Sequence, residues 1–310
     1  MGTSQFQNVL ADGKKTIDTL KSTKNQTKTA SLLRLSFSEV HTVMERAVAR
    51  GLSRRNENEE YEHVCLDEKA IRKGHEYVSI LYDARNGAVL EVAEGRKDES
   101  VKELCTKALT NNQRANVRTV CTDMWPAFIK GANTYFPNAL HCHDLYHCVT
   151  YLNEAVDKVR KREVLNYCEL KRSKYLWLKD ESKYTAYDGG RMEQLRKMNL
   201  EVVKAWEIKE LFRSLIQLHY DGAMDAYREF YDWFYYATRY NIEEVDTVAF
   251  MFKRHFIGIR NAIVTRANNG KAERMNGSIQ ELKTIGRGYK DAAHFRIAIL
   301  FFYGKLDMGR

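Results

Sequence analysis

The order of strand-like and helix-like segments between residues 61 and 144 constrains the fold more than any other feature of the sequence. Three strand-like runs come first, and the Asn86-Gly87 pair between the second and third predicts a tight hairpin. Two helix-like segments then alternate with two more strand-like runs. Strands joined by tight turns pair antiparallel, whereas strands that follow helices pair parallel. The segment therefore predicts an α/β fold around one mixed five-stranded sheet. The expected strands are residues 61–67, 76–82, 88–94, 117–122 and 139–143, and the expected helices are residues 100–109 and 127–135.

Two acidic residues close neighbouring strands of this expected sheet. Asp67 ends the first strand and Asp123 ends the fourth. In a sheet ordered 3-2-1-4-5 these strands are parallel neighbours, so their carboxyl ends lie at the edge where the strand order reverses and where such sheets bind ligands. Two carboxylates there, with a third from a packing helix, suit two magnesium ions about 4 Å apart, because Mg²⁺ prefers oxygen ligands. Aspartates at strand ends also occur in ordinary turns, so spacing alone leaves a structural role open.

Residues 145–255 differ from the segment before them, because helical periodicity continues there almost without turn-forming residues. Neither of the two prolines in the chain falls within this stretch. Aromatic residues are dense at 227–236, and a packed helical core explains them better than a surface on which bases stack. We expect residues 158–257 to form an all-helical insertion. After it, residues 270–284 read as a helix that carries Glu273.

The first 58 residues divide into a polar tail and a short helical motif. Residues 1–25 are polar and weakly periodic, so we expect a mobile tail. Residues 26–58 read as two short helices that cross at a tight turn, with Ser36 or Ser38 as the cap of the second helix and Gly51 as its end. The spacing is typical of a helix-turn-helix, although an ordinary helical hairpin gives the same pattern.

A helix-turn-helix in this position would place His41, Thr42 and Arg46 of the second helix in a major groove of DNA. The placement of charge also indicates a polyanionic partner. The chain has a net charge of +9; residues 1–55 hold ten basic and four acidic residues, and residues 253–310 hold twelve and four. Basic ends around a slightly acidic middle suit nucleic acid, although a basic face can simply be solvated.

Three features of the sequence indicate where in the cell the protein is found. The sequence has no stretch of about 18 consecutive apolar residues, so we expect no membrane span. The segment Met1–Lys15 lacks the apolar run of a secretory signal. Most of the six cysteines lie inside apolar or periodic segments, which favours reduced, buried thiols over a disulfide framework. These features together predict a cytosolic protein.

Histidines and cysteines gather around the end of the fifth expected strand. Structural zinc sites draw their ligands from both sides of a longer loop, and strand alternation turns Cys142 away from His141 and His143. Zinc is therefore disfavoured. Asp144 and His147 are interpreted as possible accessory residues at the catalytic edge, and a helix cap by Asp144 with a packed His147 explains them equally well. The whole cluster is His141, Cys142, His143, Asp144, His147 and Cys148.

Short motifs that follow one another over about residues 28–304 carry a family resemblance. These motifs are Leu66–Glu68, Arg72–Val78, Thr122–Phe128, Asp144–His147, Leu152–Arg160, Asn269–Ile279, Gly288–Tyr289 and Phe295–Arg296. Together they resemble the ISL3 family of insertion-sequence transposases. The resemblance implies an Asp-Asp-Glu (DDE) transposase with a ribonuclease-H-like fold and a helical insertion between the second and third acids.

The resemblance also implies roles for individual residues. Asp67, Asp123 and Glu273 would be the catalytic carboxylates and the ligands of two Mg²⁺ ions, which Mn²⁺ can replace. Lys271 and Arg274 flank Glu273 and suit contact with DNA phosphates. The catalytic domain would comprise residues 59–157 and 258–310 on either side of the insertion.

The expected function is cut-and-paste transposition. The enzyme would bind the terminal inverted repeats of its element, hydrolyse a strand, and direct the new 3′-hydroxyl to target DNA. Its partners would be DNA, Mg²⁺ and a second protomer, because two element ends must be paired. We expect it to work in the bacterial cytoplasm, at the nucleoid.

One departure from the family keeps two alternatives open. ISL3 transposases usually carry a cysteine-rich zinc finger ahead of the helix-turn-helix, and this sequence has no cysteine before Cys65. A truncated or domesticated relative that binds DNA without cutting it is the first alternative. Another ribonuclease-H-like nuclease, such as a junction resolvase, is the second, although the long insertion and the motifs disfavour it.

Overall fold

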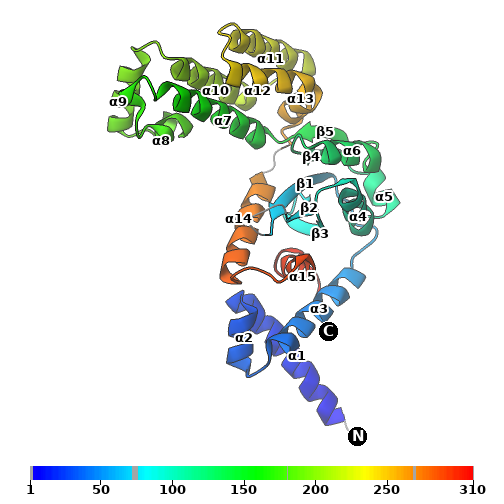
Figure 1. Cartoon of the computed structure of the whole chain (residues 1–310). Helices are drawn as coiled ribbons and strands as arrows, with labels where there is room; N and C mark the ends of the chain where they lie inside the picture. The colour runs from blue at the N-terminus through cyan, green and yellow to red at the C-terminus, as the bar shows by residue number, and fades with distance from the viewer. Residues whose placement is uncertain (1–2, 72–75, 180, 268–269, 310) are drawn as a thin grey trace. The chain divides into compact units, whose positions relative to one another are not determined.

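The computed structural model describes residues 3–71, 76–179, 181–267 and 270–309; for residues 3–12 and 270–273 it describes the backbone alone. The chain divides into two compact units. The first unit comprises Met1–His141 and Asn269–Arg310, and the second comprises Cys142–Asn268. Figure 1 labels their helices and strands.

The first unit contains the sheet and the helices that cover it. Its elements in chain order are α1 (Thr3–Thr23), α2 (Gln26–Leu33), α3 (Phe37–Ser53), β1 (His63–Ala70), β2 (Tyr77–Asp83), β3 (Ala88–Glu94), α4 (Asp98–Ala108), α5 (Asn111–Ala115), β4 (Thr119–Thr122), α6 (Pro126–Tyr135), β5 (Leu140–His143), α14 (Gly270–Ile285) and α15 (Ala292–Tyr303). The strand β5 runs across the boundary into the second unit.

The second unit is helical after β5. Its elements are α7 (Leu145–Glu163), η1 (Cys168–Leu170), α8 (Lys174–Leu178), η2 (Glu181–Lys183), α9 (Ala186–Arg196), α10 (Glu201–Gln217), α11 (Ala223–Thr238), α12 (Glu243–Arg254) and α13 (Phe256–Thr265).

The sheet has five strands in the order β3-β2-β1-β4-β5, which confirms the predicted order. The strands β1, β2 and β3 form an antiparallel meander, and β4 pairs parallel to β1. The predicted hairpin lies between β2 and β3. Gly87 has a φ of +68° there, and its amide donates to the carbonyl of Asp83 at 2.8 Å. Glycine adopts this left-handed backbone without the steric strain that a side chain would cause.

Four expectations about boundaries were wrong. The strand β1 continues three residues past Asp67, because its antiparallel partner β2 extends the pairing to Ala70. Residues 3–23 form the helix α1 in place of a mobile tail, since Leu20 is buried against the rest of the unit. The helix α3 continues through Gly51, which is buried inside it. The insertion occupies residues 142–268 where 158–257 was expected, because α7 and α13 pack with its other helices.

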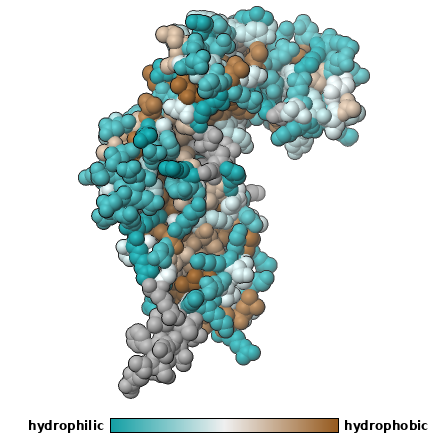
Figure 2. Space-filling model, turned by 180° about the vertical axis from the view of Figure 1, so that it is seen from behind, coloured by the Kyte–Doolittle hydropathy of each residue, from teal (hydrophilic) through white to brown (hydrophobic). Residues whose placement is uncertain are grey.

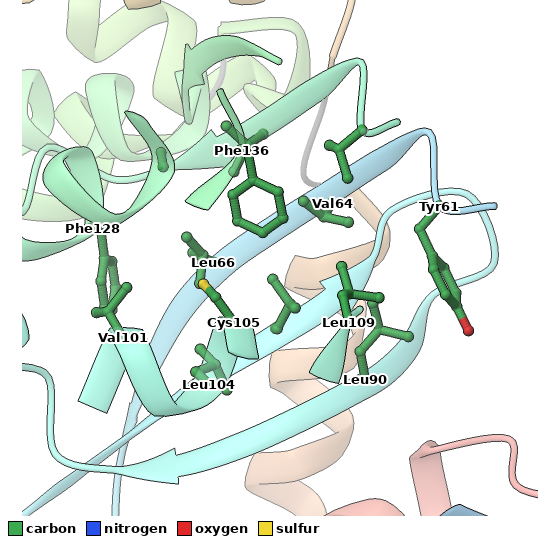
Figure 3. Packing of buried hydrophobic residues seen from close by; sticks show 14 of the residues in the cluster. Tyr61, Val64, Leu66, Leu90, Val101, Leu104, Cys105, Leu109, Phe128 and Phe136 are labelled. Carbon is green, nitrogen blue, oxygen red and sulfur yellow. The ribbon is translucent and has the colours of Figure 1, made fainter. Parts of the chain in front are cut away.

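One face of the sheet is covered by α4 and α6. Even-numbered residues of β1 point to this face and join a continuous apolar cluster, as alternation along a strand requires (Figure 3). Val64 and Leu66 contact this cluster from β1, Leu104 contributes from α4, and Phe128 from α6; all four are fully buried. The odd-numbered residues of β1, which include Asp67, therefore point to the opposite face.

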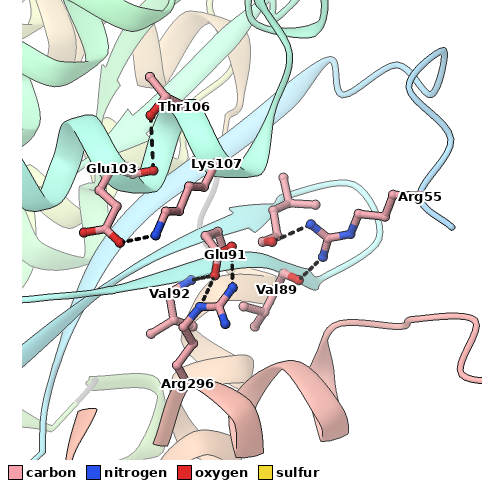
Figure 4. Close-up of polar contacts among 9 residues, drawn as sticks. Arg55, Val89, Glu91, Val92, Glu103, Thr106, Lys107 and Arg296 are labelled. Carbon is pink, nitrogen blue, oxygen red and sulfur yellow. Dashed lines mark hydrogen bonds and ion pairs between the residues drawn. The ribbon is translucent and has the colours of Figure 1, made fainter. Parts of the chain in front are cut away.

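The opposite face is covered by α14 and α15. Arg296 of α15 donates two hydrogen bonds, from Nε at 2.7 Å and Nη2 at 2.8 Å, to the carboxylate of the buried Glu91 on β3 (Figure 4). Arg55, which follows α3, donates to the carbonyls of Val89 and Leu90 on the same strand. These contacts fix α15 and the end of the N-terminal segment to the edge of the sheet.

The helices α2 and α3 form a hairpin with a three-residue connection. Arg34 adopts a left-handed backbone with φ of +56° directly after α2. Ser36 then caps α3, accepting from the amide of Glu39 while the Glu39 carboxylate accepts from the Ser36 amide. Of the two serines predicted as caps, Ser36 is the one used. Val40 and Met44 of α3 are fully buried.

The second unit has a core of large aromatic side chains. Phe230, Trp233 and Phe234 of α11 are buried, whereas Tyr227 and Tyr235 on the same helix are exposed. The expectation of a packed helical core therefore holds for the buried residues of this aromatic segment. None of the helices in the described part of the chain is both long and apolar enough to cross a membrane. Hydrophilic residues cover most of the face that Figure 2 shows, with hydrophobic residues scattered among them.

Candidate active site

The register of the parallel pair brings Asp67 and Asp123 together. Leu66 of β1 is paired with Thr122 of β4; Asp67 is the next residue of β1, and Asp123 directly follows β4. Neighbouring strands are about 4.8 Å apart. The backbones of β1 and β4 therefore have this spacing at Leu66 and Thr122, the residues directly before the two aspartates. β1 continues past this point as a partner of β2 alone. Parallel pairing between β1 and β4 thus ends just before Asp123, and from Asp67 onward β1 has no pairing with β4.

Asp67 is buried, with 7% of its surface exposed, and its two oxygens accept different hydrogen bonds. Oδ1 accepts from the backbone amide of Glu68 at 2.7 Å, and Oδ2 accepts from Nδ2 of Asn276 on α14. The hydroxyl of Tyr82 on β2 donates to Oδ1 of Asn276 at 2.6 Å. Burial raises the pKa of Tyr82 well above its usual value, and the charges of Asp67 and Cys65 act in the same direction, so the hydroxyl keeps its proton. This network orients the Asn276 amide toward Asp67.

Asp123 is half-buried and precedes α6. Its Oδ1 accepts from the backbone amide of Trp125 at 2.9 Å, which fixes the turn into the helix. The guanidinium of Arg96 stacks between the rings of Trp125 and Tyr77, 4.2 Å and 4.3 Å from their centroids. Arg96 also pairs with the carboxylate of Glu68 at 3.0 Å. The turn that carries Asp123 is thereby linked to β2 and to the residue next to Asp67.

Glu273 lies in the first turn of α14, and its side chain is outside the part of the chain that the structure describes. Asn276 is three positions further along and shares a helix face with it. Three residues rise about 4.5 Å along a helix, so the contact between Asn276 and Asp67 brings the backbone of Glu273 within about one turn of that carboxylate. Among the described side chains, no group of three histidines, cysteines, aspartates or glutamates is placed to hold one metal ion.

The interpretation of Gly277 was wrong. A small residue there was expected to let α14 approach the sheet closely. A Cβ added at Gly277 would meet nothing within 4 Å. The approach of α14 depends instead on Asn276, which reaches Asp67, and on Lys283, whose Nζ donates to the carbonyl of Ala70 at 3.0 Å.

Two basic residues, Lys271 and Arg274, lie close to Glu273 on α14. Arg274 is exposed on α14, as a phosphate contact requires, and its carbonyl accepts from the hydroxyl of Ser278 at 3.1 Å. Lys271 has its side chain outside the described residues. On the strand opposite, Lys69 is half-buried, and burial lowers the pKa of its ammonium group against the attraction of Asp67.

Asp144 and His147 belong to the second unit. Asp144 is the N-cap of α7: its Oδ1 accepts from the amide of Tyr146 at 2.9 Å, and its Oδ2 lies 2.7 Å from Nδ1 of His147. The cap and the packed histidine, which were one of the two interpretations from sequence, are therefore present. The accessory catalytic role remains a prediction.

The histidines and cysteines around β5 contact different neighbours. Nε2 of His141 lies 2.8 Å from the hydroxyl of Thr122. Sγ of Cys142 lies 3.6 Å from the hydroxyl of Thr265. The ring of His143 packs against Gly258, where an added Cβ would come within 2.4 Å of it. Each of these three side chains is thus engaged with a residue outside the cluster.

The predicted DNA-reading residues of α3 divide into two groups. Arg46 is exposed and Thr42 is half-exposed. His41 packs against α15: its ring stacks on that of His294 with centroids 4.3 Å apart. His41 therefore stabilises the contact between α3 and α15 in this arrangement.

Sequence reasoning placed Asn276 on the same helix face as Glu273 and missed its contact with Asp67. Tyr82 and Arg96 were missed entirely. The alternation of β2 could have indicated Tyr82, because Cys65 and Tyr82 are register partners and share a face with Asp67. Nothing in the sequence indicates that Arg96 stacks between two rings.

This chain is similar to known transposases. Residues 64–299 match the model of the ISL3-type DDE family, described as transposase. The transposase for insertion sequence element IS1001 of Bordetella parapertussis is 24% identical over 269 residues, which cover 84% of this chain and 66% of that protein. The transposase for insertion sequence element IS1557 of Mycobacterium tuberculosis is 21% identical over 294 residues, covering 86% of this chain and 65% of that protein. The chain thus spans just under two thirds of the length of these relatives.

Proposed function

Because this chain belongs to the ISL3 family of DDE transposases, we propose that it cuts the DNA strands at the ends of an insertion sequence and joins them to a target. The observation that carries the proposal is that two acids come directly after the last register pair of two parallel strands, with α14 tied to one of them. Asp67 and Asp123 each follow the last register pair of β1 and β4, and Asn276 on α14 contacts Asp67. Glu273 is the third carboxylate of the proposed site.

The donor set suits divalent magnesium or manganese. Asp67, Asp123 and Glu273 offer carboxylate oxygens, which hard cations prefer. A bound pair of ions would supply a polarised water or 3′-hydroxyl as nucleophile and a stabilised leaving oxygen. Asp67 is buried and each of its oxygens accepts a hydrogen bond, and hydrogen-bonded carboxylates are typical of metal ligands.

The residues of the chain itself contribute orientation and charge. Asn276 and Tyr82 hold the Asp67 carboxylate in one direction. Lys271 and Arg274 on α14 are proposed to contact phosphates beside the scissile bond. Asp144 and His147 are proposed as accessory groups, with Asp144 orienting the imidazole through the 2.7 Å contact.

The hairpin of α2 and α3 is proposed to be a helix-turn-helix that binds the terminal repeats of the element. Exposed Arg46 and half-exposed Thr42 would face the major groove. His41, stacked on His294, would set the position of this helix on the catalytic unit. A second protomer would pair the other end of the element, in the bacterial cytoplasm where the DNA lies.

A strand-cleavage assay tests this function. The protein would be incubated with DNA that carries the repeats flanking its element, with Mg²⁺, with Mn²⁺, or with EDTA. We expect nicks at the repeat ends with either metal and none with EDTA. Specific binding to the repeats with no cleavage under any metal would instead indicate a DNA-binding relative that does not cut.

A further inference from the structure

A basic turn, residues 171–174, lies where η1 meets α8 in the second unit. Figure 1 shows α8 and α9 at one end of this unit and α11 and α13 at the other. The side chains of Lys171, Arg172 and Lys174 are exposed, whereas Ser173 between them is buried. The three cations therefore lie on the solvent side of the turn.

These three cations differ from others in the unit because they are not paired. Among the described residues, no carboxylate forms an ion pair with any of the three, and their side chains make no hydrogen bond. On the neighbouring helices, Lys161 pairs with Asp157 at 2.9 Å, and Arg196 pairs with Glu181 at 3.0 Å. Positive charge that is exposed and not neutralised within the protein favours an anionic partner.

The backbone of the basic turn is held by Arg191 of α9. Nη2 of Arg191 donates to the carbonyls of Glu169 and Lys171, at 3.1 Å and 2.7 Å. Nη1 donates to the carbonyl of Arg172 at 3.4 Å. Glu169 is the only acidic residue between positions 164 and 179, so Arg191 adds to a local excess of positive charge. A surface that is already ordered loses less conformational entropy when it binds a partner.

We propose that Lys171, Arg172 and Lys174 bind backbone phosphates of duplex DNA. The proposal rests on the function proposed above, and it gives the second unit a DNA contact that the candidate active site does not include. Lysine and arginine on phosphates supply affinity and fix the register of a duplex without reading its sequence. The insertion would therefore hold DNA of any sequence through this turn.

The salt dependence of DNA binding by the full chain tests the proposal. Each phosphate neutralised by a cation contributes about 0.9 to the slope of log K against log salt concentration on duplex DNA. The test variant, Lys171→Gln with Lys174→Gln, removes two cations of the basic turn. The matched control, Arg228→Gln with Lys253→Gln, removes two exposed cations from α11 and α12 of the same unit. Each protein is measured on a duplex that carries the element end and on one of scrambled sequence.

We expect the slope of the test variant to fall by about 2 on both duplexes, and that of the control to stay near the wild-type value. Circular dichroism melts verify that the variants are folded. If the test variant is not, the single variant Arg172→Asn serves, with an expected fall of about 1, because asparagine tolerates the left-handed backbone at φ of +57°.

Three results would overturn the proposal. The first is a folded test variant that keeps the wild-type slope. The second is an equal fall in the control, which would show a general effect of net charge. The third is a fall on the element-end duplex alone, because phosphate contacts do not distinguish sequences.

Wild-type cleavage in the same buffer separates this proposal from the proposed function. Cleavage by the wild type together with an unchanged slope in the test variant refutes the phosphate contacts alone. If the wild type binds both duplexes and cuts neither, the proposed function is refuted, and the slopes still decide the phosphate contacts. Failure of the wild type to bind either duplex refutes both.

Discussion

The side-chain amide of Asn276 donates a hydrogen bond to the carboxylate of Asp67, although the two residues are 209 positions apart in the sequence. One lies on the helix that follows the insertion and the other on the first strand of the sheet. The contact joins the two segments of the first unit that the insertion separates in sequence. It also places α14, the helix that carries Glu273, beside Asp67 at the end of the β1–β4 pairing.

The first prediction concerns this contact. Asn276→Ala removes the group that orients Asp67, and partners of this kind affect metal affinity or activity by about 10–100-fold. We expect cleavage to fall by that amount and the Mg²⁺ concentration for half-maximal rate to rise. Tyr82→Phe removes only the hydroxyl that holds Asn276 and should give a smaller effect in the same direction. An unchanged magnesium requirement in both variants would show that the contact is structural only.

The second prediction concerns the ion pair between α15 and β3. Arg296→Ala leaves the carboxylate of Glu91 buried without its bidentate partner, so the free energy of unfolding should fall by about 2–3 kcal/mol. The control is Lys107→Ala, which breaks an exposed pair with Glu103 and should cost less than about 1 kcal/mol. Urea denaturation of the three proteins measures both. Equal losses in the two variants would contradict the importance given to burial of Glu91.

The third prediction concerns pH. Burial lowers the pKa of His41, and the charge of His294 acts in the same direction, against Glu45 and Asp291. The folded protein therefore favours neutral His41. This stabilisation is complete above the ordinary histidine pKa of about 6.5 and is lost as the pH falls through the lower folded value. Between pH 7.5 and 5.0, His41→Phe should lose less stability than the wild type. The exposed residue His219 provides the control, His219→Gln, which should follow the wild type.

The fourth prediction compares two helical glycines. A Cβ at Gly51 would lie 2.6 Å from Cβ of Leu306, whereas one at Gly277 would meet nothing within 4 Å. We expect Gly51→Ala to destabilise the protein by about 1–3 kcal/mol through overpacking. Gly277→Ala should stabilise it by about 0.5–1 kcal/mol, because alanine favours the helix. Thermal melts of the two variants would decide; destabilisation by Gly277→Ala would restore the idea that α14 needs a small residue there.

Much of the sheet could be predicted from the sequence because its signals are local. The Asn86-Gly87 turn, strand alternation and the helices between later strands gave the order of all five strands. The end of β1 could not be predicted in the same way, since its extension to Ala70 depends on pairing with β2. The helix α1 was missed because its polar sequence conceals the few residues, such as Leu20, that are buried.

The site was predicted less completely than the sheet. The acids on neighbouring strands followed from strand order, and the family motif indicated Glu273. The contacts that orient them depend on tertiary packing between distant segments. Asn276 and Tyr82 are ordinary residues of a helix and a strand until α14 lies against β1, and only then do they form a network with Asp67.

The most direct test of the proposed mechanism is a comparison of two glutamates on α14 in the cleavage assay. Glu273→Gln keeps the size of the side chain and removes the charge that would hold metal. Glu281→Gln makes the same change about 12 Å further along the helix axis, too far for the same ions. With Mg²⁺ and DNA carrying the flanking repeats, we expect Glu273→Gln to lower cleavage by orders of magnitude while DNA binding persists, as Asp67→Asn and Asp123→Asn should. Glu281→Gln should cleave at the wild-type rate. Cleavage by Glu273→Gln at the wild-type rate would contradict the assignment of the third carboxylate.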